Sequence, residues 1–371
     1  MYDLIVVGGG PAGAATAILC ARRGARVLLF ERGRFPRHKV CGEFVSAESL
    51  DLLAELLYGE NAHLLREAIR IPQARMFLDG RVLRAPIEPA AFSIARFDLD
   101  AALCSTAKGS GIEVREQVTV RSIAGDGPFV VSSSLGEHEA QAVVNATGRW
   151  SNLNARSARD GKAQAKWVGL KAHFAEAAPP ASVDLYFFDG GYCGVQPVNL
   201  TNRTDEQRIN ACAMVRADVA TTMPEMLALH PALRERSSGW RALSNPVSVG
   251  PLLFRKPQPQ SDGILRVGDA AAFVDPFVGD GISLALRSGA LAAECLRPFF
   301  SGMTDIREAL RRYTTQYERQ LTPVFQTSAR IRRLLRLPRA LRAPILLALE
   351  KTPAIARHLV SSTRTQPAGT L

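Results

Sequence analysis

The first thirty residues constrain the fold most, because they place a glycine-rich turn between a short apolar strand and a helix. Gly8, Gly10 and Gly13 form a G-x-G-x-x-G pattern directly after the apolar run of residues 4–7. In this pattern the glycines permit a tight turn, a close approach of backbone to a pyrophosphate, and close packing of helix on strand. The helix expected over residues 11–23 offers the free N–H groups of its N-terminus to a diphosphate. The stretch therefore predicts a dinucleotide-binding βαβ unit.

An acidic residue follows at the position that such a unit requires. Glu31 comes directly after a second apolar strand at residues 27–30 and lies 18 residues beyond Gly13. This spacing is typical of an acid that hydrogen-bonds an adenosine ribose. A carboxylate there favours an unphosphorylated ribose, which indicates FAD or NAD rather than NADP.

The composition is that of a globular protein. The 371 residues suffice for two domains or one interrupted domain, and 47% of them are apolar. No run approaches the roughly 18 apolar residues that span a bilayer. The first strand begins at Asp3, so we expect no cleaved signal peptide. Six scattered cysteines without a C-x-x-C pair fit a reduced, cytoplasmic protein with no metal site.

The positive charge is concentrated at one end of the chain. Residues 330–371 carry nine Lys or Arg and one acid, Glu350, so they hold +8 of the total +11. This distribution argues against a nucleic-acid binder with a uniformly basic surface. Leucines and arginines recur at helical spacing over residues 330–358, interrupted by Pro338, Pro344 and Pro353. The pattern predicts two or three short amphipathic helices, which either pack on the parent domain or dock on an anionic membrane or an acidic carrier protein.

The middle of the chain predicts antiparallel sheet. Asp79-Gly80 divides the alternating stretch of residues 74–87, which is a strong hairpin signal. Further strands of this sheet are expected at residues 167–174, 183–188 and 209–215, with surface helix and loop at 224–239. Other strands are expected at residues 112–120 and 143–146, with an edge strand at 130–134, and a helix is expected to begin near Ser46.

A second glycine-rich segment resembles the first in its order of elements. A strand beginning at Ile264 ends at Gly268-Asp269, a loop continues to Gly281, and a long Ala-rich helix begins near Ile282. The start of that helix is a second place where N–H groups and a positive helix end stabilise negative charge.

Four segments carry a resemblance to a known family. The R-x-K-x-C-G-E segment of residues 37–43 resembles the motif of the geranylgeranyl reductase branch of the FAD-dependent oxidoreductases. Residues 8–13 with Glu31, Arg96-Phe97-Asp98 (resembling an R-x-x-x-D element) and residues 268–282 are similar to other motifs of that family. The Ala-Thr-Gly of residues 146–148 is similar to a motif near FAD in two-domain flavoproteins.

The resemblance extends to about residue 325 and implies a p-hydroxybenzoate-hydroxylase-like α/β fold. It implies a discontinuous Rossmann-type FAD-binding domain with an inserted antiparallel-sheet substrate domain and a C-terminal helical tail. We assign residues 1–70, 95–165 and 251–325 to the FAD-binding domain, 71–94 and 166–250 to the substrate domain, and 326–371 to basic amphipathic helices.

The resemblance also implies roles for individual residues. Asp269 would accept a hydrogen bond from the ribityl chain, and Gly281 and Ile282 would bring N–H groups toward flavin N1 and O2. Cys41 lies in the segment beside the flavin, and Tyr192 lies in a Gly-Tyr…Pro segment that lines the substrate cavity. From the residues alone, Cys41 could equally be a small buried side chain and Tyr192 a structural residue of a hairpin. The predicted cofactor contacts are Gly8, Gly10, Gly13, Glu31, Arg37, Cys41, Gly42, Arg96, Val118, Gly148, Asp269, Gly281 and Ile282.

We therefore expect an FAD-dependent oxidoreductase that moves a hydride from reduced flavin to an alkene of a lipophilic, isoprenoid or polyketide-like substrate. Cys41 or Tyr192 would supply the proton. The chain has no second G-x-G-x-x-G after a strand, so NAD(P)H would bind transiently beside the flavin. The alternatives are an FAD-dependent monooxygenase acting on a lipophilic or aromatic substrate, and a flavoprotein without catalysis. A halogenase ranks lower because the W-x-W-x-I-P motif of that class is absent. Ala272 stands in place of the histidine of the hydroxylase G-D-A-A-H motif, which favours the reductase-like branch without excluding oxygenation.

Overall fold

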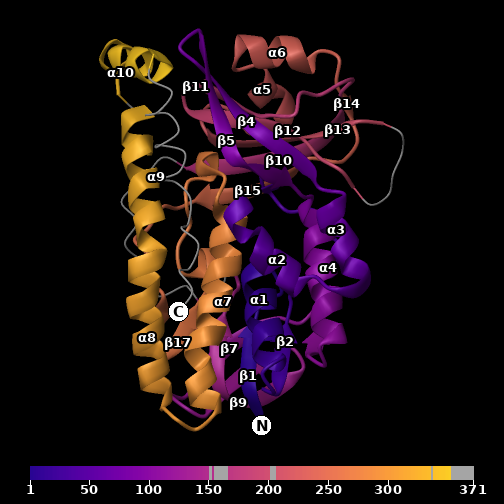
Figure 1. Ribbon diagram of the computed structural model, residues 1–371, viewed down its shortest axis with the longest axis vertical. Coiled ribbons are helices and arrows are strands. Elements are labelled where there is room, and N and C mark those ends of the chain that lie inside the picture. The colour runs from indigo at the N-terminus through magenta and orange to yellow at the C-terminus, as the bar shows by residue number, and fades with distance from the viewer. Residues whose placement is uncertain (150–152, 154–165, 201–205, 336, 352–371) are drawn as a thin grey trace.

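The computed structural model describes residues 1–149, 153, 166–200, 206–335 and 337–351, without the side chains of 346 and 349–351. Two sheets divide the molecule along its long axis (Figure 1). The first, with strand order β16-β17-β9-β1-β2-β6, contains the glycine-rich turn. The second, with order β14-β10-β13-β12-β11-β4-β5-β3, lies above it in the figure.

The first sheet is parallel where it meets the glycine-rich turn. β1 (Tyr2–Val7) lies between β2 (Val27–Phe30) and β9 (Gly136–Asn145) and runs parallel to both. A strand flanked on both sides and covered on both faces needs a continuous apolar sequence, and residues 4–7 are buried. β17 (Ile264–Arg266) continues the parallel order beside β9, as β6 (Glu113–Arg115) does beside β2.

Helices cover the first sheet, and small residues let them approach it. α1 (Pro11–Ala21) and α7 (Gly281–Phe300) pack against each other in the largest buried cluster of the described residues. A Cβ at Gly289 of α7 would lie 2.3 Å from the carbonyl oxygen of Ala12, so glycine is required at this crossing. The remaining elements of this half are α2 (Leu50–Leu56), α3 (His63–Arg66), α4 (Arg96–Gly109), β7 (Val120–Ala124), β8 (Phe129–Ser133), β16 (Gln260–Ser261) and the short 3-10 helices at Ala47–Ser49, Gly59–Ala62, Gly268–Ala270 and Pro276–Val278.

Two expectations for this half need correction at their boundaries. The strand expected over residues 112–120 is divided into β6 and β7. Gln117 adopts φ +61 and donates its N–H to the carbonyl of Gly33, which takes the chain out of the sheet. The α-helix expected near Ser46 begins at Leu50, after a 3-10 turn.

The second sheet is built around the predicted hairpin. β4 (Ile69–Leu78) and β5 (Arg81–Ser93) are antiparallel, and Asp79 and Gly80 connect them at φ +54 and +78. Positive φ at both central residues is typical of the tight turns whose twist matches a hairpin. The other strands are β3 (Phe44–Val45), β10 (Trp167–Ala175), β11 (Val183–Phe188), β12 (Gly191–Pro197), β13 (Arg208–Arg216), β14 (Arg241–Ala242) and β15 (Val247–Leu252).

The two faces of the second sheet have different neighbours. α5 (Met223–Leu227) and α6 (Pro231–Ser237) cover the outer face, where they bury Cys193 and Val195 of β12. Tyr192, which precedes Cys193 in β12, points to the opposite face and packs with Met214 and Leu252. This alternation directs one row of the sheet toward the first sheet.

The C-terminal segment forms helices along one side of the molecule (Figure 1). These are α8 (Ile306–Gln320), α9 (Thr322–Leu335) and α10 (Arg339–Lys351). Pro338 separates α9 from α10 as predicted, but the expectation that Pro344 also interrupts the helix was wrong, because α10 continues through it. Proline removes the bond to the carbonyl of Ala340, which is exposed, so solvent can take its place. Pro353 lies outside the described residues.

The architecture confirms the predicted α/β fold class. A parallel Rossmann-type sheet is interrupted in sequence by an antiparallel sheet and followed by helices. The domain boundaries themselves stay a prediction. Among the described helices, none has the length and apolar character needed to cross a bilayer.

Candidate active site

A cavity of about 1060 Å³ lies between the two sheets and reaches from the glycine-rich turn to the C-terminal helices. Its volume is at the upper end of the range of about 300–1,000 Å³ for small-molecule sites. One end is lined by backbone and charged side chains, and the other by apolar side chains of β4, β5, β11, β12 and α9. Two chemically different parts of one ligand, or two ligands, can therefore meet in it.

The glycines of the turn have distinct structural roles. A Cβ at Gly8 would lie 2.3 Å from the carbonyl oxygen of Ala146, and one at Gly13 would lie 1.9 Å from the carbonyl oxygen of Gly8. At Gly10 the nearest atom to such a Cβ is Nζ of Lys39, at 3.7 Å, so space remains above the backbone. Gly8 and Gly10 line the cavity, whereas Gly13 is buried behind the turn and is not among its lining residues.

Glu31 shapes the turn from the end of β2. Its carboxylate accepts hydrogen bonds from the N–H groups of Gly9 (2.9 Å) and Gly33 (2.7 Å) and pairs with Arg37 at 2.8 Å. Burial alone would raise the pKa of Glu31, but nearby Lys39 and the two N–H groups lower it below its ordinary value. The side chain is therefore a buried carboxylate at the cavity wall, next to the positive end of α1.

Two cations are held above Gly10 by an acid that the sequence analysis did not single out. Arg96 binds the carboxylate of Asp100 through two nitrogens, at 2.7 and 2.8 Å, and Lys39 binds it at 3.0 Å. Asp100 is fully buried, and although burial opposes it, the pair of cations lowers its pKa to about 2. Asp100 stands four residues after Arg96, at the acid position of the R-x-x-x-D element. The cations and the N-terminus of α1 make this end of the cavity suited to a diphosphate.

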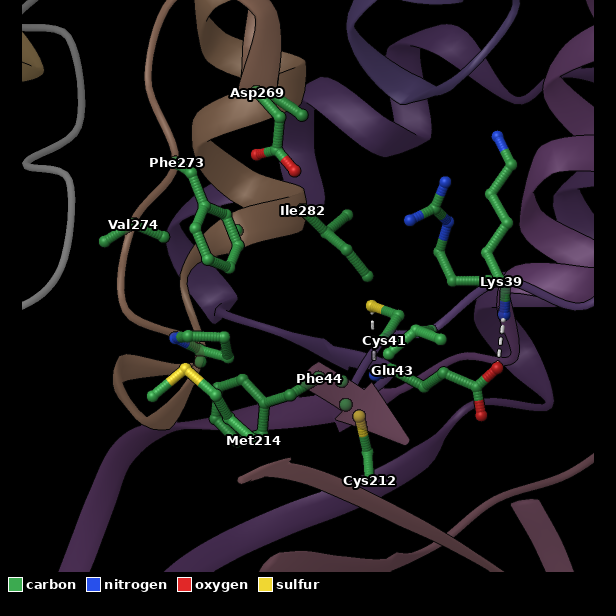
Figure 2. A pocket seen from close by; sticks show the side chains of 18 of the residues that line it. Lys39, Cys41, Glu43, Phe44, Cys212, Met214, Asp269, Phe273, Val274 and Ile282 are labelled. Carbon is green, nitrogen blue, oxygen red and sulfur yellow. Dashed lines mark hydrogen bonds between the residues drawn. The ribbon is translucent and has the colours of Figure 1, made fainter. Parts of the chain in front are cut away.

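The opposite wall carries the predicted flavin-side residues. The Asp269 carboxylate lies 3.5 Å from Nε of Arg149 and keeps 34% of its side-chain surface accessible, because it faces the cavity. Burial raises the pKa of Asp269, and Arg149 acts against that shift. Figure 2 shows the Asp269 carboxylate and the Cys41 thiol directed toward the same open region, with Ile282 between them.

The remaining predicted cofactor residues leave room in this wall. A Cβ at Gly281 would find its nearest atom 4.0 Å away, so the N-terminus of α7 is open to the cavity. A Cβ at Gly148, which adopts φ +75, would have no atom within 4 Å, and Val118 contributes an apolar contact surface. Apart from Gly13, every predicted cofactor residue lines the cavity. Their contact with the cofactor itself stays a prediction.

Cys41 is held in place by a buried charged group. Its Sγ accepts the N–H of Glu43 at 3.3 Å, and Asn210 donates to its carbonyl oxygen at 2.9 Å. Glu43 adopts φ +61 and is fully buried, with its carboxylate bound by Lys171, by Nε2 of His173 at 2.8 Å and by the N–H of Arg96 at 2.8 Å. Burial opposes ionisation, but Lys171 and His173 lower the pKa of Glu43 to about 2.

Tyr192 is the polar side chain at the apolar end. It is buried between Phe187 and Phe277, and its hydroxyl has no hydrogen-bond partner among the described residues. Burial, and then Asp275, raise the pKa of Tyr192 well above its ordinary value. The hydroxyl therefore keeps its proton at neutral pH, on a side chain that lines the cavity.

The C-terminal helices close the apolar end. Ile331, Leu334 and Leu335 of α9 line the cavity opposite Leu78 and Leu83 of the hairpin. Arg332 lies 3.4 Å from Asp275 and 4.0 Å from the centre of the Phe254 ring. Part of the cationic tail therefore packs on its own domain, which was one of the two alternatives expected for it.

The parallel sheet, the glycine turn with Glu31, and the open helix ends define the class as a dinucleotide-binding flavoprotein. The residues fit FAD in particular, because Glu31, predicted at the ribose, and Asp269, predicted at the flavin side, line one continuous cavity. The family model described as FAD binding domain matches residues 1–326, and the chain belongs to this family. It is an FAD-dependent oxidoreductase.

Relatives support the same assignment. The chain is 27% identical to digeranylgeranylglycerophospholipid reductase 2 of Methanopyrus kandleri, over 88% of its own length and 84% of that protein. It is 24% identical to Conditioned medium factor receptor 1 of Dictyostelium discoideum, covering 84% of this chain but 66% of that one. The predicted resemblance to the geranylgeranyl reductase-like branch is confirmed.

Solved structures share the fold. The geranylgeranyl bacteriochlorophyll reductase-like protein of Thermoplasma acidophilum superposes with a TM-score of 0.77 and 19% identity, covering 99% of this chain and 97% of that one. The flavin-dependent brominase Bmp2 superposes equally well, with a TM-score of 0.78 and 19% identity over 98% and 93% of the chains. The fold is thus common to reductases and halogenases, and the reaction has to be argued from the site.

Proposed function

We propose that the protein reduces an alkene of a lipophilic substrate, an isoprenoid or polyketide-like chain, with reduced FAD as hydride donor. One observation supports this most: the cofactor end of the cavity is continuous with an apolar end whose buried hydroxyl, that of Tyr192, has no hydrogen-bond partner among the described residues. An extended hydrocarbon chain suits that lining, because its burial there removes apolar surface from water.

The residues that would hold FAD lie along one cavity. Gly10, Lys39 and Arg96 would bind the diphosphate, and Asp269 would accept a hydrogen bond from the ribityl hydroxyls. FAD, once reduced, supplies a hydride at its flavin ring. NAD(P)H is the proposed reductant and would enter the same cavity before the substrate.

Tyr192 is the proposed proton donor. One alkene carbon gains the hydride, the neighbouring carbon gains the proton of the tyrosine hydroxyl, and solvent then reprotonates the tyrosine. Positioned acids of this kind contribute about 10²–10⁴-fold to a rate. Cys41, whose thiol faces the flavin side of the cavity, is the second candidate for this proton.

The decisive experiment compares turnover of a polyprenyl substrate with and without oxygen, using the mass of the product. We expect a gain of two hydrogens under both conditions. A gain of one oxygen, with no product under anaerobic conditions, would overturn the proposal in favour of a monooxygenase.

A further inference from the structure

The corner where α10 meets the β4–β5 hairpin is held by ion pairs. Arg342 binds the two carboxylate oxygens of Asp79 at 2.6 Å each, and Arg339 lies 3.4 Å from the same group. Arg342 also donates to the carbonyl of Leu335 at 2.8 Å, which ties α10 to the end of α9. These contacts place α10 at the tip of the hairpin, at one end of the molecule (Figure 1).

The outward face of α10 is apolar. Leu341 is 59% exposed, Ile345 37% and Leu347 39%, and Val82 of the adjoining hairpin is 41% exposed. These four make up nearly half of the nine large hydrophobic side chains that are exposed in the described part of the chain. Single exposed hydrophobic residues are ordinary, but a group of them on one surface marks a site of interaction. We call these four residues the α10 surface.

The spacing places most of this surface on one face of the helix, with Leu347 at its edge. Leu341, Ile345 and Ala348 are related by four and seven positions and are all exposed, as is Pro344 between them. Arg342 and Ala343, on the other side of the helix, are half-buried against the hairpin. A helix whose charged side is turned to its own domain and whose apolar side is exposed has no partner for that side among the described residues.

Exposed cations lie on the elements that adjoin α10. Arg84 of the hairpin and Arg333 of α9 are exposed, and the Arg339 side chain keeps 69% of its surface accessible despite its contact with Asp79. The whole segment from residue 330 carries a net charge of +8. An exposed apolar helix face combined with nearby arginines is typical of helices that lie in the interface of a bilayer. A protein partner would more commonly meet such a helix with its charges interleaved along the apolar face.

We propose that the α10 surface docks on an anionic phospholipid bilayer, with its apolar side chains at the acyl boundary and the arginines at the headgroups. The cavity reaches this corner, because Val82, Leu83 and Leu335 line it. A lipophilic substrate could pass from the bilayer into the cavity without crossing water. That last step rests on the proposed function, but docking does not, and the experiment below contains no substrate.

The test is sedimentation of the full-length, FAD-loaded protein with vesicles of phosphatidylcholine alone or with phosphatidylglycerol added. We expect binding to the anionic vesicles at low salt and a loss at high salt, because the Debye length shortens from about 30 Å at 0.01 M to about 3 Å at 1 M. Equal binding to the neutral vesicles, or no binding at low salt, would overturn the proposal.

Matched variants locate the surface. Leu341→Gln with Ile345→Gln keeps good helix formers and should weaken binding about tenfold or more, since two apolar side chains leave the bilayer. Arg333→Gln should weaken it less and reduce the salt dependence. Met303→Gln with Leu135→Gln, and Arg307→Gln, alter exposed residues of the same kinds elsewhere and should change nothing.

Retention of FAD and of the thermal midpoint verifies that each variant is folded. Unchanged vesicle binding by the folded Leu341→Gln, Ile345→Gln variant would contradict the proposal. So would binding of the wild-type protein to a purified acidic carrier protein but not to anionic vesicles.

Discussion

The carboxylate of Glu43 and Nε2 of His173 lie 2.8 Å apart in a fully buried position, although 130 residues separate them in the chain. Lys171 binds the other carboxylate oxygen. An acid of the R-x-K-x-C-G-E segment is thus joined to two basic side chains of β10. Because Glu43 follows Cys41 by two residues, this group fixes the cavity segment that carries the thiol. We regard Glu43 as a positioning residue.

Removing the charge of Glu43 should destabilise the protein strongly. Glu43→Gln leaves Lys171 buried without its counter-charge, and loss of one partner of a buried pair costs about 3–5 kcal/mol. Chemical denaturation of the holoprotein measures this change. Glu116→Gln, which removes an acid that pairs with the exposed Lys108, is the matched control and should cost about 1 kcal/mol or less. A Glu43 variant as stable as its control would contradict the role.

The same group predicts how stability depends on pH. The pKa of Glu43 falls from an ordinary 4.5 to about 2 on folding, so its contribution is fully present above pH 4.5. It is lost as pH falls through the folded value, because the unfolded chain then binds the proton more readily. We expect the free energy of unfolding to drop between about pH 4.5 and 2, and less steeply in Glu43→Gln. Equal slopes in the two proteins would contradict this assignment.

Asp269→Ala should weaken FAD binding without unfolding the protein, because the carboxylate faces the cavity rather than the core. Loss of a hydrogen bond to a charged group costs about 1.5–3 kcal/mol, roughly a 10- to 150-fold rise in the dissociation constant. Titration of the apoprotein with FAD, followed by flavin fluorescence, measures it. Asp126→Ala changes an exposed acid and is the control. If the Asp269 variant binds FAD as tightly as the wild-type protein, Asp269 has only a structural role in its loop.

Tyr192→Phe should slow reduction of the substrate and leave reduction of the bound flavin by NAD(P)H unchanged. The variant removes one hydroxyl that lacks a protein partner, so the fold should be unaffected. Rapid-mixing absorbance separates the two half-reactions, and we expect the substrate half-reaction to fall about 10²-fold or more. If both half-reactions keep their wild-type rates, Tyr192 is not the acid.

Cys41→Ser distinguishes the second candidate for the proton. If the thiol is the acid, only the half-reaction with substrate slows. If Cys41 instead shapes the flavin environment, the two half-reactions slow together and the flavin absorption spectrum shifts. Cys104→Ser, which alters a buried cysteine of α4 outside the cavity lining, is the control.

Local sequence patterns predicted the cofactor end well, because their physical causes are local. Gly13 is required by its approach to the carbonyl oxygen of Gly8 within one βαβ unit, and Glu31 ends the next strand of that unit. Gly8 is the exception, because it is required by the carbonyl oxygen of Ala146, far along the chain. The R-x-x-x-D spacing counted from Arg96 ends at Asp100, the acid that binds the Arg96 guanidinium. Pro344, by contrast, predicts a break in the helix but lies on an exposed turn of α10.

The buried group around Glu43 could not be predicted from such patterns. Its members are brought together only when β10 of the second sheet packs on the segment after β2. The one available signal was in the predicted strand of residues 167–174, where Lys171 and His173 share a face of an otherwise apolar strand. Two bases on a buried face require an acid from elsewhere in the chain.

The most direct test of the account is the identity and amount of cofactor that the purified protein holds. Denaturation followed by chromatography of the released nucleotide, with absorbance of the native protein, gives both. We predict a yellow protein that holds one FAD per chain and releases it on unfolding. A colourless protein that cannot be reconstituted with FAD, or one that releases NAD or FMN instead, would contradict the central claim.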